Sequence, residues 1–107
     1  MFTRHCLQGY KHSVEGILRK TLVHGERMLL TEFLMKKGSH LPQHSHPQDQ
    51  TGYLVSGSIR LRIGEDSLEL KPGDSWYVPG NITHEADVID EAVAIEVFSP
   101  LREDYLP

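Results

Sequence analysis

Three histidines and one glutamine are the residues of this chain whose types and spacing are best suited to chemistry. His44 and His46 are separated by one residue, Gln50 follows shortly after, and His84 lies further along the chain. Side chains two residues apart in an extended strand point to the same face, so His44 and His46 can present both imidazoles to one metal ion. Gln50 has the same parity if the strand resumes after Pro47, and a facing strand could bring His84 opposite. Three neutral imidazoles and an amide oxygen predict a site for one divalent metal ion, with coordination positions left open for water or substrate.

The remaining histidines receive a simpler interpretation. An isolated histidine is more often a surface side chain or a hydrogen-bonded core residue than a metal ligand. We therefore expect no metal at His5, His12, His24 and His40.

Glu96 is a further candidate for chemistry, and it lies in a predicted strand from Ala92 to Phe98. Period-two alternation puts Glu96, Phe98 and two alanines on one face and three β-branched residues on the other. A charged glutamate is rarely buried without a partner, so an inward-facing Glu96 would lie near a metal, an arginine or a substrate. The alternative interpretation leaves Glu96 exposed and packs the β-branched face into the core.

The elements that must position these residues are short β-strands. Nine glycines and six prolines separate short apolar runs, and no segment keeps a helical apolar period for long. Many short strands of this kind indicate an all-β sandwich or barrel. A tight hairpin is expected at Gly57, and a connection between two strands at Asp90-Glu91. The predicted strands are 14–23, 27–36, 59–63, 67–70, 75–78, 83–89 and 92–98, followed by a tail at 100–107 that crosses the barrel surface.

Length and composition limit the classes of protein. The chain has 107 residues, with 11 Lys and Arg against 15 Asp and Glu, which gives a formal net charge of −4. This length allows one domain and excludes an appended regulatory domain, and the acidic balance argues against nucleic-acid or membrane partners. Cys6 is the single cysteine, which excludes an internal disulfide and fits a reducing compartment. No apolar run reaches the length of a membrane span and no signal peptide is recognised, so a cytoplasmic location is expected.

The segment around the first histidines resembles a known family motif. The pattern Gly38-x5-His44-x-His46-x3-Gln50-x6-Gly57 resembles the first motif of the cupin family, Gly-x5-His-x-His-x3,4-Glu-x6-Gly. Gln50 stands where the family has glutamate. An amide in this position leaves the metal without an anionic protein ligand, so the ion keeps its full charge and attracts carboxylates and enolates.

A second segment resembles the other cupin motif. Gly73-x5-Pro79-Gly80-x3-His84 is similar to Gly-x5-Pro-x-Gly-x2-His-x3-Asn. The inner glycine comes one place early and Val88 replaces the final asparagine, but the interval from Pro79 to His84 is that of the family. The two motifs together imply an antiparallel jelly-roll β-barrel with a metal at its open end.

The cupin resemblance implies one domain over residues 1–107, with a barrel core at about 11–100 and a C-terminal tail at 101–107. It implies one divalent ion, zinc, nickel, iron or manganese, and paired barrels that form a homodimer. The implied metal ligands are His44, His46, Gln50 and His84.

The end of the chain resembles one group within the cupins. The segment from Glu96 to Leu106 is similar to the ending Asp-Val-Phe-Ser-Pro-Pro-Arg-Glu-Asp-Tyr-Leu of the small pectin-degradation cupins, which ketonise 4,5-unsaturated uronates left by pectin or alginate lyases. Carried over by position, the catalytic carboxylate of that group falls on Glu96, its aromatic residue on Phe98 and its carboxylate-binding arginine on Arg102. The partner implied by this resemblance is a small anionic sugar acid.

Two other functions remain open from the sequence. A three-histidine Fe(II) cupin with open coordination positions could activate O₂ as a small dioxygenase, which requires a redox metal, whereas ketonisation tolerates zinc or nickel. A cupin that binds a sugar or a metal without catalysis is the other alternative. Replacing Glu96 would then alter affinity and reveal no turnover.

Overall fold

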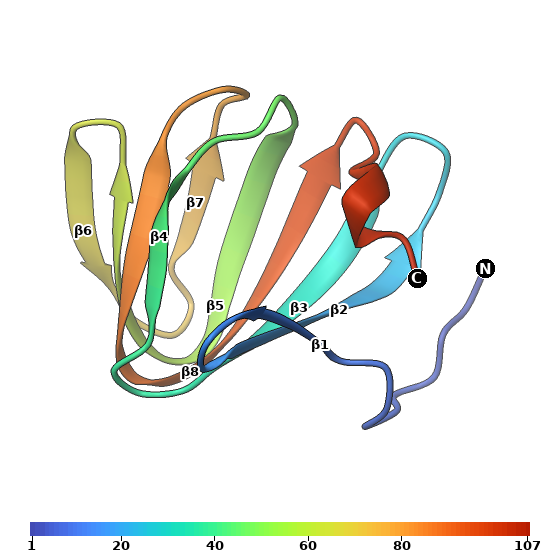
Figure 1. Ribbon diagram of the computed structural model, residues 1–107, viewed down its shortest axis with the longest axis horizontal. Helices are drawn as coiled ribbons and strands as arrows, with labels where there is room; N and C mark the ends of the chain where they lie inside the picture. The colour runs from blue at the N-terminus through green and yellow to red at the C-terminus, as the bar shows by residue number, and fades with distance from the viewer.

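The computed structural model describes residues 1–107 as an antiparallel β-barrel of eight strands with a short 3₁₀ helix near the C-terminus (Figure 1). This architecture confirms the predicted all-β jelly roll. None of its helical segments has the length and apolar character that a membrane crossing requires. The elements are β1 (Lys11–Val14), β2 (Ile17–His24), β3 (Leu29–Met35), β4 (His40–His44), β5 (Asp49–Ile63), β6 (Asp66–Leu70), β7 (Ser75–Val78), β8 (His84–Ser99) and the 3₁₀ helix (Glu103–Tyr105).

Two long strands, β5 and β8, run through both walls of the barrel. The first half of β8 pairs with β4 and with the second half of β5, whereas its second half pairs with β3 and with the first half of β5. The strand β6 extends one wall, and β1, β2 and β7 extend the other. In Figure 1, β8 runs along one wall, bends at the end where the walls meet and returns along the other.

Two strand boundaries expected from the sequence are not found at this bend. The predicted hairpin at Gly57 and the predicted connection at Asp90-Glu91 are both absent, because β5 and β8 continue through these positions. Gly57 does adopt a positive φ of 80°, but it faces β8 so closely that a Cβ there would overlap the carbonyl oxygen of Glu91. The register shifts on both sides of this point, so the paired strands turn the corner through bulges without ending.

Two smaller expectations also need correction. The predicted strand at 14–23 is divided into β1 and β2 by a turn at Glu15-Gly16, where Gly16 has a φ of 83°. The tail, expected to cross the barrel surface, contains the 3₁₀ turn and buries Tyr105 against the core. The C-terminal segment is therefore part of the packed barrel.

The inward faces of both walls form one apolar core. On β8, Ala92, Ala94 and Phe98 are almost inaccessible, and on β3 the buried residues alternate with half-buried ones. At one rim of the barrel β4 ends, β5 begins, and β8 both begins and ends (Figure 1). The polar residues of interest gather at this rim.

Candidate metal centre

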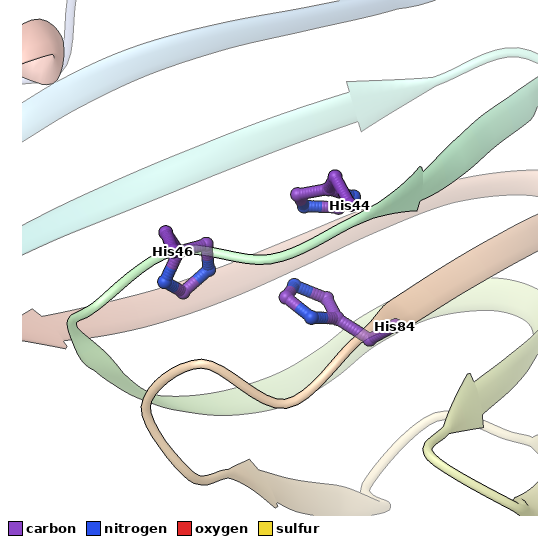
Figure 2. Close-up of side chains that lie close together, drawn as sticks. All are labelled: His44, His46 and His84. Atoms are coloured by element: carbon purple, nitrogen blue, oxygen red, sulfur yellow. The ribbon is translucent and has the colours of Figure 1, made fainter.

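Three histidine side chains converge at this rim. His44, the last residue of β4, pairs in register with His84, the first residue of β8. His46 lies in the loop after β4, outside the extended strand that the sequence predicts, and still lies beside the other two rings (Figure 2). The potential ligand atoms of the three residues all lie within 4.8 Å of one another.

Backbone carbonyls determine which ring nitrogen of each histidine is free. Each Nδ1 lies within hydrogen-bond distance of a carbonyl oxygen two residues away: 2.8 Å for His44 and Pro42, 3.0 Å for His46 and Gln48, and 3.0 Å for His84 and Ile82. An Nδ1–H that donates to a carbonyl leaves the lone pair of a neutral imidazole on Nε2. All three histidines can therefore offer Nε2 as a metal ligand.

Burial favours the neutral form of two of these rings. It lowers the pKa of His84 to about 4, even though the hydrogen bond to the Ile82 carbonyl acts in the opposite direction. Burial also lowers the pKa of His46, and the positive charge of Arg102 adds to this effect. A neutral imidazole keeps the lone pair that a divalent ion requires.

Gln50 shows that this group of residues fits a cation. Its Oε1 lies 2.9 Å from Nε2 of His46, a buried ring whose Nδ1–H already points to the Gln48 carbonyl. In a neutral His46 two acceptor lone pairs then face each other, and a cation between them would satisfy both. The amide NH₂ of Gln50 lies on the side of Glu96, where it helps to stabilise the carboxylate. Three Nε2 atoms and one amide oxygen suit zinc, nickel, iron or manganese.

Glu96 lies on the inward face of β8, as its parity predicts. It lines the interior cavity, whereas the neighbouring β-branched residues lie on the opposite face, so the alternative of an exposed Glu96 is wrong. Burial raises the pKa of the Glu96 carboxyl to about 7, although Gln50, Trp76 and Arg102 all act to lower it. A carboxyl group with a pKa near neutrality can both accept and return a proton.

Trp76 is a cavity residue that the sequence pattern does not single out. In the sheet, Gly52 of β5 lies between Trp76 of β7 and Glu96 of β8. A Cβ at Gly52 would overlap the indole, so the ring lies across this glycine. The buried indole N–H acts with Gln50 to lower the pKa of Glu96, whereas the buried hydroxyl of Thr31, on the other side of Glu96, has no hydrogen-bond partner. Glu96 thus has polar neighbours in both directions, and the hydroxyl of Thr31 is free to make a further hydrogen bond.

The C-terminal tail carries Arg102 over the same rim. The guanidinium carbon of Arg102 lies 5.1 Å from the ring centre of Phe98 and 3.9 Å from that of Tyr105. Its Nε donates to the carboxylate of Asp104 at 3.2 and 3.3 Å, and only 14% of the side chain is exposed. Phe98 also contacts the ring of His46 edge-on at 5.5 Å between centres. The two terminal nitrogens of Arg102 remain available for a ligand.

One cavity brings most of the predicted site residues together. Its volume of about 40 Å³ has room for about three waters. His40 lies outside it and pairs with Asp87 at 2.7 Å on the surface. The polar and aromatic lining consists of His44, Gln50, His84, Glu96, Phe98 and Arg102, together with Trp76 and Tyr105, which the sequence analysis did not select; His46 is buried beside them.

Sequence comparison identifies a family and one relative. The sequence profile described as a cupin domain matches residues 31–98. An uncharacterized protein of Streptomyces coelicolor is 29% identical over 69 residues. This match covers 64% of the present chain and 66% of that protein, just under two thirds of its length.

Two solved structures are similar over almost the whole chain. KdgF from Halomonas sp. matches with a TM-score of 0.92 and 27% identity, and the match covers 99% of this chain and 100% of that one. An RmlC-like cupin from Shewanella frigidimarina matches with a TM-score of 0.92 and 26% identity over 98% of this chain and 95% of that one. The TT1209 protein of Thermus thermophilus, with 22% identity and a TM-score of 0.78, shares the fold.

Proposed function

The chain belongs to the cupin domain family, and on this premise we propose that it is a metal-dependent enzyme of sugar-acid breakdown. His44, His46, Gln50 and His84 would hold one divalent ion. The reaction is the ketonisation and ring opening of 4,5-unsaturated uronates derived from pectin or alginate.

The observation that carries this proposal is the position of Glu96 and Arg102. Both residues line the cavity that also contains His44, His84 and Gln50, although Arg102 comes from the tail and the others from three strands. A proton-transfer group, a guanidinium and a metal site within one cavity suit an anionic substrate that exchanges protons. The resemblance of the segment from Glu96 to Leu106 to the ending of the small pectin-degradation cupins, together with the full-length similarity to KdgF, supports the substrate class.

The reaction is an isomerisation, so no atom is gained or lost overall. The anomeric hydroxyl of the unsaturated sugar loses a proton and becomes an aldehyde as the bond between C1 and the ring oxygen breaks. The C4 carbon gains a proton, and C5 becomes a ketone. Catalysis therefore requires a group that moves protons and an environment that stabilises the negative charge that develops on the C5 oxygen.

The side chains at the rim divide these tasks. Arg102 binds the substrate carboxylate through its two terminal nitrogens, because Asp104 occupies the Nε–H. Glu96, with its pKa raised to about 7, accepts and returns the proton. Phe98 forms an apolar floor beneath Arg102 and limits the access of water. When bound, the metal ion supplies positive charge for the developing oxyanion. The substrate lies at the rim, beside Arg102 and the histidines, with its reacting edge toward Glu96.

The direct test is incubation of the protein, loaded in turn with zinc, nickel, iron or manganese, with lyase-generated unsaturated galacturonate. The expected result is a loss of the double-bond absorbance that is faster than the spontaneous reaction. The matched controls are the metal-free protein and the Glu96→Gln variant, both of which should approach the spontaneous rate. A wild-type rate equal to the spontaneous rate with each of the four metals would refute the proposal.

The same samples distinguish the alternative functions. Oxygen consumption by the iron-loaded protein, without loss of the double bond, would favour the dioxygenase. Saturable binding of a uronate without turnover would favour a binding module. Both outcomes contradict the ketonisation proposal.

We also propose that two copies of the barrel form a homodimer. The outer face of the wall formed by β3, β8, β5 and β7 is largely apolar: Tyr53 lies opposite Ile95, and Tyr77 and Val97 both lie opposite Thr51. Tyr53 is 50% exposed and Tyr77 is 54% exposed. A continuous apolar face of this kind is typical of a protein interface, and a second copy would cover it.

A further inference from the structure

We infer that Arg19, on β2, is a positioning residue that holds Arg102 in its substrate-binding orientation through Tyr105 and Asp104. The inference rests on the proposed role of Arg102 as the carboxylate-binding group. Arg19 lies more than eighty positions before Arg102 in the sequence and does not line the cavity of the candidate site. It reaches Arg102 only through the folded tail.

The first connection is an aromatic ring between two guanidinium groups. The guanidinium carbon of Arg19 lies 4.0 Å from the ring centre of Tyr105, and that of Arg102 lies 3.9 Å from the same centre. Two groups this close to one ring centre cannot share a face, so they lie on opposite faces. Each face of an aromatic ring carries partial negative charge and attracts a cation. Tyr105 thus separates the two positive charges and attracts both.

The edges of the Tyr105 ring are also held. Phe98 contacts it edge-on at 5.3 Å between ring centres, and Phe33 lies at 6.3 Å. Arg19 covers its face of the ring beside a second cavity, of about 260 Å³, which Tyr105, Lys11 and Lys20 also line. Removing the guanidinium of Arg19 would open this face to water and let the ring tilt away from Arg102.

The second connection runs through the backbone of the tail. Nη2 of Arg19 donates to the carbonyl of Asp104 at 3.4 Å, and the hydroxyl of Thr21 donates to the carbonyl of Tyr105. The carboxylate of the same Asp104 accepts from Nε of Arg102 at 3.2 Å. Arg19 therefore restrains both partners of Arg102, the ring beneath its guanidinium and the carboxylate at its Nε. Together they direct the two terminal nitrogens toward the cavity.

A general electrostatic effect can be separated from this geometry. Lys11 pairs in register with Arg19 and lines the same second cavity, but it makes neither a cation–π contact with the Tyr105 ring nor a hydrogen bond to Asp104. Lys11→Met removes one positive charge from the same place as Arg19→Met. It is the matched control for charge without contact.

The first measurement needs no substrate. In the ¹⁵N spectrum of the zinc-loaded protein, the six arginines each give an Nε–H signal, and Arg102→Lys identifies that of Arg102. We expect Arg19→Met to move this signal toward the position of a solvent-exposed arginine and to speed its exchange, and Lys11→Met to leave it in place. An Arg102 signal unchanged in Arg19→Met would overturn the inference.

The second measurement is a double-mutant comparison with unsaturated galacturonate. Arg19→Met should raise KM about five- to tenfold with kcat close to the wild-type value, as expected for weaker uniform binding. Arg19→Lys should recover part of this loss, because an ammonium group can still lie over the ring. In an Arg102→Ala background, Arg19→Met should raise KM no further, because Arg19 acts through the missing residue.

Effects on KM that multiply in the double variant would show that Arg19 acts independently of Arg102 and would overturn the inference. Absence of turnover in the wild-type protein would refute the proposed function. In that case the arginine spectra still decide whether Arg19 positions Arg102.

Discussion

Replacing Glu96 with glutamine should stabilise the metal-free protein at neutral and alkaline pH, and should remove most of the activity of the metal-loaded protein. Burial raises the pKa of this carboxyl from 4.5 to about 7. In the unfolded chain the group ionises as the pH passes about 4.5, whereas in the folded protein it stays protonated until about 7. Unfolding therefore releases a proton in this window, and the folded state loses stability as the pH rises.

The size of the effect follows from the two pKa values. At about 1.4 kcal/mol per pKa unit, ionisation of Glu96 destabilises the folded state by up to about 3 kcal/mol when the pH is above about 7. Below a pH of about 4.5 the carboxyl is protonated in both states and the destabilisation is absent. Glu96→Gln cannot ionise, so the variant should gain this amount at about pH 8 and nothing at about pH 4. For a domain of this size, the gain would raise Tm by on the order of 10 °C.

Urea unfolding of metal-free wild type and Glu96→Gln at several pH values provides the assay. Metal-free samples are required because a nearby divalent cation would favour the carboxylate. Glu69→Gln is the matched control. The exposed carboxylate of Glu69 pairs with Lys71, and this pairing lowers the pKa of Glu69. Loss of this carboxylate should therefore not stabilise the protein at any pH. A stability difference between wild type and Glu96→Gln that is the same at about pH 4 and about pH 8 would refute the reasoning. Turnover should fall by about 10²–10⁴ in the same variant.

Four other outcomes are expected. His84→Ala should reduce the metal content of the purified protein strongly, by elemental analysis, because it removes one of three imidazole ligands; full occupancy would contradict the assignment. Gly52→Ala should displace the indole of Trp76, cost about 1–3 kcal/mol in urea unfolding through overpacking, and change the fluorescence of this single tryptophan; an unchanged emission spectrum would argue against the close contact. Arg102→Ala should raise KM for the uronate with a smaller effect on kcat, and lysine at this position should recover only part of the loss, which steady-state kinetics would show. Light scattering should give about twice the 12.2 kDa mass of the chain, and a monomer at micromolar concentration would exclude the dimer.

Local sequence patterns account for the parts of the site that depend on strand parity. The alternation along β8 indicates that Glu96 and Phe98 share a face, and the structure confirms that this face is the interior. The rings of His44 and His46 lie 5.9 Å apart between centres even though His46 lies beyond the end of β4. Parity is a local property of the backbone and can be read over a few residues.

The remaining features depend on partners that no local pattern identifies. Trp76 reaches Glu96 only because Gly52, on a third strand, leaves room for the indole. Arg19 meets Tyr105 across most of the length of the chain. At Gly57 the sequence correctly predicts a positive φ. A tight hairpin and a bulged corner can both require a glycine with positive φ, so this residue alone does not distinguish them. Only the register between strands distinguishes these possibilities.

The carbonyl groups that hold the histidine rings have a consequence for metal exchange. Because the Nδ1 atoms of His44, His46 and His84 are anchored to the backbone, the ligands are already oriented without an ion, and loading requires little rearrangement. An ion can then leave and another can replace it while the barrel stays folded, unlike in small domains that unfold without their metal. Since intrinsic affinity alone favours the later divalent metals of the first transition row, we expect the occupant of the proposed site to depend on which ions are available in the cell. We expect the same polypeptide to be recovered with different metals after growth in different media.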